Sequence, residues 1–378
     1  MSDLSEDSDS RPQDQEPPDP AVTLESFREW RSPRFGKANP ERMNNPVWEW
    51  LIRSKLNAFS AGERFNEPSA MDVGPGWCFD RFGQSSTVLT DGRTVLIAGE
   101  HEDYYDPDFY IYNDVVVRHP DGGIDIFGYP RNVFPQTDFH TATLIGNRVI
   151  VIGNLGYGEE RKPGTTPVKV LDLDSFAISQ METSGTPPGW LHGHSATLSE
   201  DCTSIRITKG KLELGRDDKS LVENIDDWRL HLADWRWERL TDRKWQRWEL
   251  ARRDGKYNRL WQVRSVLFYR GVGWDKEFRE QMDQLTQEHG IRPDLDIDLV
   301  ATLYRPDIPH EEMPKVEDEL GVFRIKVDGI IVRYVEDTFS IQMTVEGELA
   351  QQSIDALTSD LLAKITTLEN TPWELRKL

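Results

Sequence analysis

The sequence predicts a mainly β protein in which a repeat region is followed by a small α+β domain. Three segments of strand-like composition recur at intervals of 54 to 57 residues, and the last third of the chain mixes alternating and helical patterns. With 378 residues the chain is long enough for two domains. We divide it into a leader (1–21), a helical segment (22–76), a repeat region (77–245), a connector (246–262) and an α+β domain (263–378).

The amino-acid composition argues against several classes of protein. A net charge of −21 argues against binding to a nucleic-acid backbone, which requires dense Lys and Arg. No apolar run reaches about 18 residues, so we expect no membrane-spanning helix. Two cysteines are too few for a disulfide scaffold or a cysteine-built zinc site, and a cytoplasmic location is the simplest interpretation. The first 20 residues hold seven acids and one base, which predicts a disordered acidic leader.

A helix is expected shortly after the leader. Asn45 and Pro46 form an N-cap followed by a proline at the first helical position. Apolar residues then follow at spacings of four, four and three, which places them on one face: Trp48, Ile52, Leu56 and Phe59. This face either packs on the following domain, which we favour, or docks on a partner.

The repeat region carries the main architectural signal. Its three segments align through the threonines Thr87, Thr143 and Thr197, and through strand-ending glycines at Gly99, Gly153 and Gly210. Four short strands in each unit of about fifty residues are typical of a β-propeller blade. A closed propeller usually needs at least four blades. Either the flanking segments or a second chain complete the ring, or the three sheets form an open stack. We expect a partial propeller closed by the flanking segments.

The motifs within these units resemble the kelch repeat family. Kelch blades open with an Arg-x-Gly-His-Ser-like run, which is matched at 81–85 with Gln84 in place of His, and at 193–195. The second unit keeps His140, and the aromatic pair of the family is matched by Trp228 with Trp235 or Trp237. The Gly-Gly doublets are altered in all three units. The resemblance covers 77–245 and implies a propeller that serves as a scaffold for protein–protein contacts.

A loop of unusual composition lies between the second and third strands of the first unit. Residues 100–112 hold five carboxylates, one histidine, four tyrosines and a phenylalanine. Loops of repeat scaffolds often carry binding function. We therefore expect a binding site formed by this loop and by histidines of the neighbouring units: Glu100, His101, Glu102, Asp103, Tyr104, Tyr105, Asp108, Tyr110, His140, His192 and His194.

Two interpretations of these residues remain open. Imidazoles with carboxylates suit zinc, iron or manganese, and tyrosine faces suit a sugar or a peptide. Alternatively, the histidines and acids form hydrogen bonds between blades, which we favour. No spacing is a metal signature, so the sequence assigns no metal and no cofactor.

The connector is basic and rich in tryptophan, whereas the domain after it is acidic. Interleaved aromatic and basic residues can bind single-stranded nucleic acid. We favour the alternative that the tryptophans fill the core between the domains and that the arginines face acids of the same chain.

The α+β domain is expected to follow the order β-α-β-β-β-β-α, with helices on one face of an antiparallel sheet. The predicted strands are 263–270, 295–303, 323–327, 330–335 and 339–345, and the predicted helices are 274–290 and 354–368. Asp328 and Gly329 give a strong hairpin signal. The domain contains no phosphate loop, nucleophile elbow or Cys/His pair.

These patterns favour a non-enzymatic protein–protein interaction module. The alternative is a metal- or carbohydrate-dependent enzyme with a His/carboxylate site on the propeller face. The expected partner is a protein, with a carbohydrate as the second class of ligand and no role for nucleic acid or membrane.

Overall fold

The computed structural model describes residues 22–67, 74–101, 109–215, 221–256, 258–260, 264, 297–316, 319 and 321–378. The chain forms two compact units, Met1–Asp242 and Arg243–Leu378. Both consist mainly of antiparallel sheets with few helices, which confirms the mainly β class. Within the described residues no helix is long and apolar enough to cross a membrane. The leader 1–21 lies outside the described residues.

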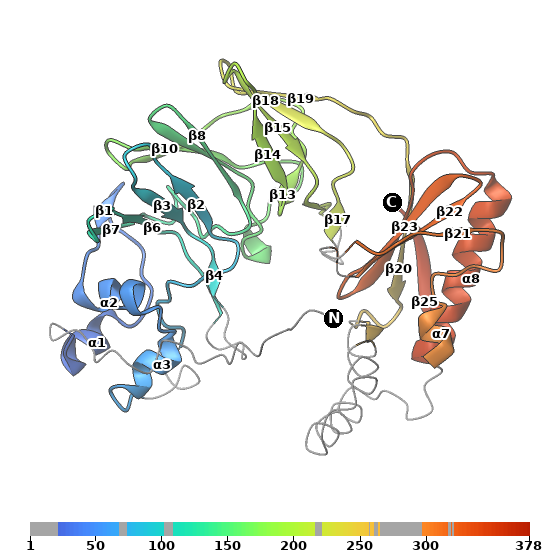
Figure 1. Ribbon diagram of the computed structural model, residues 1–378, viewed down its shortest axis with the longest axis horizontal. Coiled ribbons are helices and arrows are strands. Elements are labelled where there is room, and N and C mark those ends of the chain that lie inside the picture. The colour runs from blue at the N-terminus through green and yellow to red at the C-terminus, as the bar shows by residue number, and fades with distance from the viewer. Residues whose placement is uncertain are drawn as a thin grey trace, which may run out of the picture. The chain divides into compact units, whose positions relative to one another are not determined.

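The first unit contains three repeat sheets, which we call sheets 1, 2 and 3 (Figure 1). Sheet 1 contains β1 (Glu41–Arg42), β7 (Ile124–Gly128), β6 (Val115–Arg118), β3 (Thr94–Ile97) and β2 (Ser85–Val88) in spatial order. Sheet 2 contains β11 (Ile178–Gln180), β10 (Val168–Asp172), β9 (Arg148–Ile152) and β8 (Thr141–Ile145). Sheet 3 contains β12 (Ser184–Gly185), β19 (Arg236–Arg239), β18 (Trp228–His231), β15 (Ser204–Thr208) and β14 (Ser195–Leu198). All neighbours are antiparallel except β12 and β19.

The aligned residues occupy equivalent places in the three sheets. Thr87, Thr143 and Thr197 lie on β2, β8 and β14, the first strand of each sheet. The glycines that follow the second strands, Gly99, Gly153 and Gly210, have φ angles of 93°, 79° and 87°. A side chain in this left-handed region is strained, and a Cβ at each position would also collide with a backbone oxygen. The repeat therefore has a structural cause.

The sheets pack against each other through apolar faces. Strand β8 contacts both β2 and β14, so the first strands lie side by side. One core cluster joins sheets 1 and 2 and includes Val95, Val117 and Val149. Another joins sheets 2 and 3 and includes Ile152 and Leu230. Sheet 2 is consequently buried on both faces.

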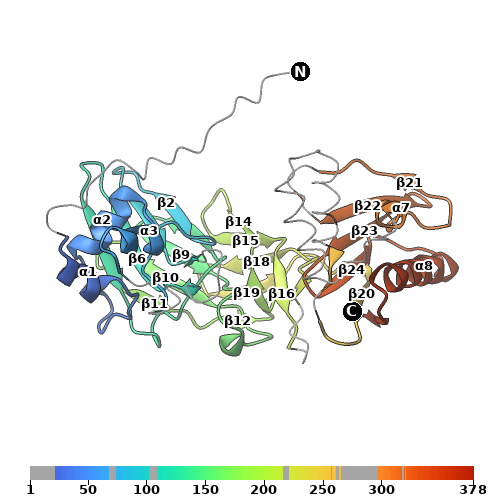
Figure 2. The same cartoon turned by 90° about the horizontal axis from the view of Figure 1, so that it is seen from below.

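The predicted N-terminal helix forms, but it is shorter than expected. Helix α2 (Pro46–Ser54) is capped by Asn45 and ends at Lys55, which has a φ of 57°. Helices α1 (Leu24–Trp30) and α3 (Ala58–Glu63) flank it, and the three pack on sheet 1 (Figure 2). The prediction that Phe59 shares the buried face is wrong: it lies on α3 and is 52% exposed, because the chain turns after Ser54.

Short elements follow the second strands of the repeat sheets, and the sequence did not predict them. In the first unit of the repeat a hairpin forms from β4 (Glu100–His101) and β5 (Tyr110–Ile111). The second repeat has the 3₁₀ turn η3 (Gly158–Glu160). The third contributes β16 (Lys211–Glu213) and β17 (Leu221–Glu223), which form a small sheet with β13 (Trp190–His192).

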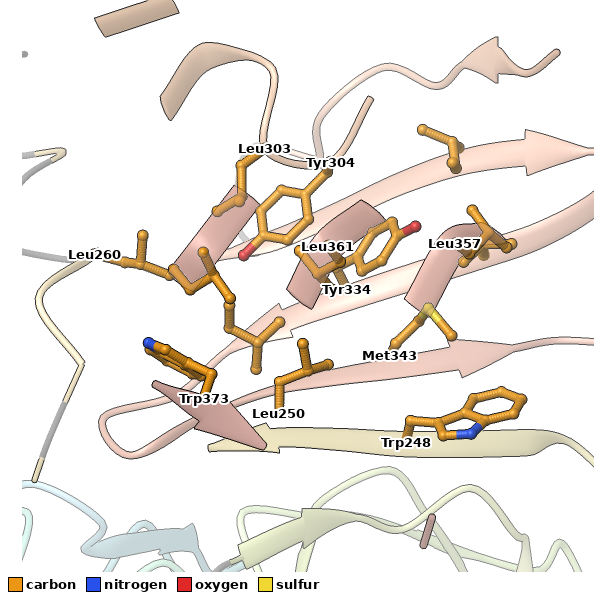
Figure 3. Packing of buried hydrophobic residues seen from close by; sticks show 14 of the residues in the cluster. Trp248, Leu250, Leu260, Leu303, Tyr304, Tyr334, Met343, Leu357, Leu361 and Trp373 are labelled. Atoms are coloured by element: carbon orange, nitrogen blue, oxygen red, sulfur yellow. The ribbon is translucent and has the colours of Figure 1, made fainter. Parts of the chain in front are cut away.

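The second unit is a six-stranded sheet with a long helix. The spatial order is β21 (Glu311–Glu312), β22 (Val322–Val327), β23 (Ile330–Glu336), β24 (Ser340–Val345), β20 (Gln246–Arg252) and β25 (Trp373–Lys377). Helix α8 (Gln351–Glu369) buries Leu357 and Leu361 in the cluster that also contains Trp248 and Leu250 of β20 (Figure 3).

Two expectations for this region are wrong. Residues 246–252 are no connector but strand β20, whose alternate side chains Trp248 and Leu250 are buried in the sheet core. The strand predicted at 295–303 is not found in its described part, since Ile297–Ala301 is helix α7. The predicted turn is confirmed, because Val327 pairs with Ile330 across Asp328 and Gly329. The predicted helix 274–290 lies outside the described residues.

Candidate functional site

The predicted loop site is described in part. Glu100 and His101 lie on β4 and Tyr110 on β5, and the two strands pair with each other. Glu102, Asp103, Tyr104, Tyr105 and Asp108 lie outside the described residues. Burial raises the pKa of Tyr110 to about 12, so its phenol is neutral and available as a hydrogen-bonding group at pH 7.

His140 and His194 join neighbouring sheets. His140 Nε2 lies 2.8 Å from Ser85 Oγ, and His194 Nε2 lies 2.8 Å from Thr141 Oγ1. Burial lowers the pKa of His140 to about 4, and burial with the nearby His140 and His192 lowers that of His194 to about 3. Both imidazoles are therefore neutral at pH 7, and they form hydrogen bonds between sheets, the interpretation that the sequence favoured over a metal site.

The other two predicted histidines have separate environments. His101 is buried, and its Nδ1 lies 2.7 Å from the carbonyl oxygen of Asp80. His192 on β13 packs edge-on against the ring of Phe139 at a centroid distance of 6.5 Å. Among the described residues no three His, Cys, Asp or Glu side chains gather as a metal site would require. The described residues therefore contain no set of side chains that could hold a metal ion.

The connections after the second strands are tied to one another. Tyr157 accepts a hydrogen bond from the backbone N of Ile111 at 3.1 Å, and its ring packs edge-on against Phe109 at 5.9 Å. Trp190 Nε1 donates to the Leu155 carbonyl at 3.0 Å. These contacts join all three repeats, and we call residues 100–101, 109–111, 154–161, 190–192 and 211–213 the loop platform.

Arg161 strengthens the same connections. Its guanidinium donates to the carbonyl oxygens of Leu155 and Gly156 at 3.0 and 3.2 Å, and it forms an ion pair with Glu213 at 3.4 Å. Because both charged groups are largely buried, the pair is screened less than a surface ion pair. The loop platform is thus held by side chains of several strands rather than by backbone pairing alone.

A buried carboxyl group lies beneath the platform. Asp138 is fully buried, and its Oδ1 accepts a hydrogen bond from the backbone N of Gly156 at 2.7 Å. Burial raises the pKa of Asp138, while the hydrogen bond from the backbone N of Gly156 acts in the opposite direction. The sequence named Glu100 but gave no signal for Asp138.

A groove of about 780 Å³ opens beside the platform. Its walls come from the connection between sheets 1 and 2, from the loop after β9 and from the outer strands of sheet 2, and include Arg131, Asn154, Glu160, Lys162, Gln180 and Trp190. The volume lies in the range of about 300–1,000 Å³ that is typical of ligand sites.

The groove contains one buried ammonium group. Lys169 on β10 is 7% exposed, and its Nζ donates to the Val133 carbonyl at 3.1 Å and to Gln180 Oε1 at 2.7 Å. Among the described residues no carboxylate pairs with it. Burial, aided by the charge of Lys162, lowers the pKa of Lys169 to about 8. The sequence offered one hint: Lys169 interrupts an apolar run, Val168 to Leu171, of the kind that is buried on both faces.

Comparisons with known proteins add little. No family model matches the chain, and no curated protein matches it. A solved structure titled "Structure of YjhT" is similar over 45% of this chain and 53% of that chain, with 12% sequence identity and a TM-score of 0.33. The chain thus spans about half the length of that protein, and a likeness at this level carries no argument about function.

Proposed function

We propose that the first unit is a kelch-like partial β-propeller with sheets 1, 2 and 3 as its blades. Three antiparallel sheets with their first strands adjacent and their faces packed together support this proposal. The repeated glycines and the histidine bonds between sheets support it further, because they recur at equivalent positions. The free thiols of Cys78 and Cys202 agree with a reducing compartment and support a cytoplasmic location.

The function that these features support best is a non-enzymatic protein-interaction module. The observation that carries this proposal is the loop platform beside a ligand-sized groove. Because Tyr157, Arg161 and Trp190 hold the connections in place, a partner would meet a surface whose order is already established. Binding to such a surface costs less conformational entropy than ordering free loops.

A capture experiment with surface variants tests this function. The intact chain would be used as bait in cell extract, together with two platform variants, Tyr110→Ala and Glu159→Ala, at side chains that are partly or fully exposed. Phe339→Ser is the matched control, because Phe339 is an exposed aromatic residue of the second unit. We expect a partner that binds the intact chain and the control with equal affinity and both platform variants at least tenfold more weakly. Partners that bind all four proteins equally would contradict the proposal.

A further inference from the structure

We infer that the groove binds a carboxylate carried by an extended peptide, and that Lys169 is the residue that recognises it. This inference rests on the proposed interaction function and deepens it, since it specifies the chemistry of the partner.

The groove contains a buried positive charge that no described carboxylate balances. Lys169 lies on a strand that is buried on both faces, yet within the described residues its ammonium group meets two neutral acceptors, the Val133 carbonyl and the Gln180 amide. An ammonium group has three donors, and its buried charge is normally balanced by a carboxylate. Two neutral hydrogen bonds could be made by an uncharged side chain, so they do not account for a buried cation. A ligand carboxylate would supply both the third acceptor and the opposite charge.

The other charged side chains that line the groove are poorly suited to recognise a ligand carboxylate. Arg131 is occupied by Glu160, which accepts a hydrogen bond from Arg131 Nε at 2.8 Å. Glu159, Lys162 and Glu182 are exposed, so water screens them strongly. An anion at the rim would gain little, whereas an anion that reaches Lys169 would pair with it where solvent is largely excluded. Selectivity for a carboxylate is therefore concentrated at one atom, Lys169 Nζ.

The size of the groove indicates the size of its ligand. A volume of about 780 Å³ is much larger than a carboxylate group requires. Pro135, Pro167 and Pro187 line the walls together with Trp190 and polar side chains, which suits a chain of alternating apolar and polar groups. The carboxylate is thus expected on a peptide, as an Asp or Glu side chain or as the C-terminal group.

Peptide selection with the full chain tests the inference. The probe is a pool of N-acetylated hexapeptides with random neutral residues, in which one position is Asp or Glu, or Asn or Gln, and the C-terminus is either an amide or a free acid. A charged hydrogen bond contributes about 1.5–3 kcal/mol, so acid-bearing peptides should bind roughly 10- to 100-fold more tightly than their amide counterparts. Lys169→Met should abolish this preference. Lys37→Met is the control, since Lys37 is exposed and does not line the groove, and it should retain the preference.

A pH series on the unchanged protein provides a second measurement that does not depend on a variant folding. Because the ammonium form of Lys169 is required, the acid preference should fall about tenfold for each pH unit above 8. The peptide carboxylates ionise well below this range. The other charged groups that line the groove are Arg131, Lys162, Glu159, Glu160 and Glu182.

Three results would overturn the inference: amide peptides that bind as tightly as acids, a preference that survives Lys169→Met, or a preference that is constant to pH 10. A partner that is captured through the platform but shows no acid preference would leave the proposed function standing and refute the inference alone. Absence of any captured partner would refute the proposed function itself.

Discussion

Replacing Lys169 with methionine should increase stability at neutral pH, which is the opposite of what a buried structural residue would show. The pKa of Lys169 falls from 10.5 to about 8 on folding, and this difference makes the charged form about 3 kcal/mol less favourable in the folded chain. Methionine has a similar length and removes this penalty. It also loses the hydrogen bonds to Val133 and Gln180, which contribute about 1 kcal/mol each. The expected net gain at pH 7 is about 1 kcal/mol.

The sign of the effect should reverse in base. Between pH 8 and 10.5 the unfolded chain holds the Lys169 proton and the folded chain releases it, so stability of the unchanged protein rises with pH through this group. The penalty shrinks to about 1 kcal/mol at pH 10, and the variant then becomes less stable than the unchanged protein by about 1 kcal/mol. Other titrating groups affect both proteins alike and cancel in the difference.

Urea denaturation of both proteins at pH 7, 8, 9 and 10 measures this difference. Because the chain has two units, the transition of the first unit must be followed separately, by a fluorophore attached at Cys202, which is exposed. A variant that is less stable by a constant amount at every pH would show that Lys169 is not desolvated. The proposal that Lys169 serves binding at a cost in stability would then be refuted.

Three further predictions concern the two cores and the histidine bonds. Trp48→Ala should destabilise the first unit by about 3–5 kcal/mol, measured by urea denaturation, because the indole is fully buried and stacks on Trp77 at 4.8 Å. The pKa of His140 is about 4 in the folded chain against an ordinary 6.5, so the unfolded chain gains its proton first and stability falls as pH drops from 7 to 4. His140→Gln should remove about 3 kcal/mol of this loss of stability. If the variant lost as much stability in acid as the unchanged protein, the buried neutral state of His140 would be contradicted. Arg252→Met should destabilise the second unit by about 3–5 kcal/mol, since Glu369 is only 2% exposed and loses its partner at 3.0 Å; adding Glu369→Met should restore most of the loss in thermal denaturation.

Sequence patterns predicted the fold best where periodicity and turn chemistry agreed. The repeat was visible because every unit needs a glycine with positive φ at the same place, as at Gly153. Strand β20 was missed because charged residues hide its alternation: Trp248 and Leu250 enter the core, while Glu249 between them is also buried. Helix α7 was missed because alternating Leu and Ile over a few residues fit a strand as well as a single helical turn.

The site was less predictable because its features depend on contacts distant in sequence. Glu100 was named from its acidic surroundings, but the buried Asp138, which accepts a hydrogen bond from the backbone N of Gly156, has no motif around it. His140 and His194 were named as candidate ligands, and their hydroxyl partners show instead that they fasten one sheet to the next. Lys169 was passed over because a lysine in a strand ordinarily faces solvent. Burial of a charge is a tertiary property that a local pattern does not encode.

The two outer faces of the three-sheet stack explain how, within the described residues, it ends without a fourth sheet. The apolar face of sheet 1 is covered by α1, α2 and α3, which form one core cluster with Val116 and Ile126. The outward face of sheet 3 instead carries Arg206, Arg229, His231 and Arg236, which register places on the same side of β15, β18 and β19. These arginine side chains are between 40% and 59% exposed and form ion pairs with neighbouring acids. Covering this face with another sheet would desolvate the charges, which costs several kcal/mol per ion when partners are imperfect. Helices at one end and charges at the other therefore serve as caps, as terminal repeats do in solenoid proteins. The expectation that flanking segments close a partial propeller stays a prediction.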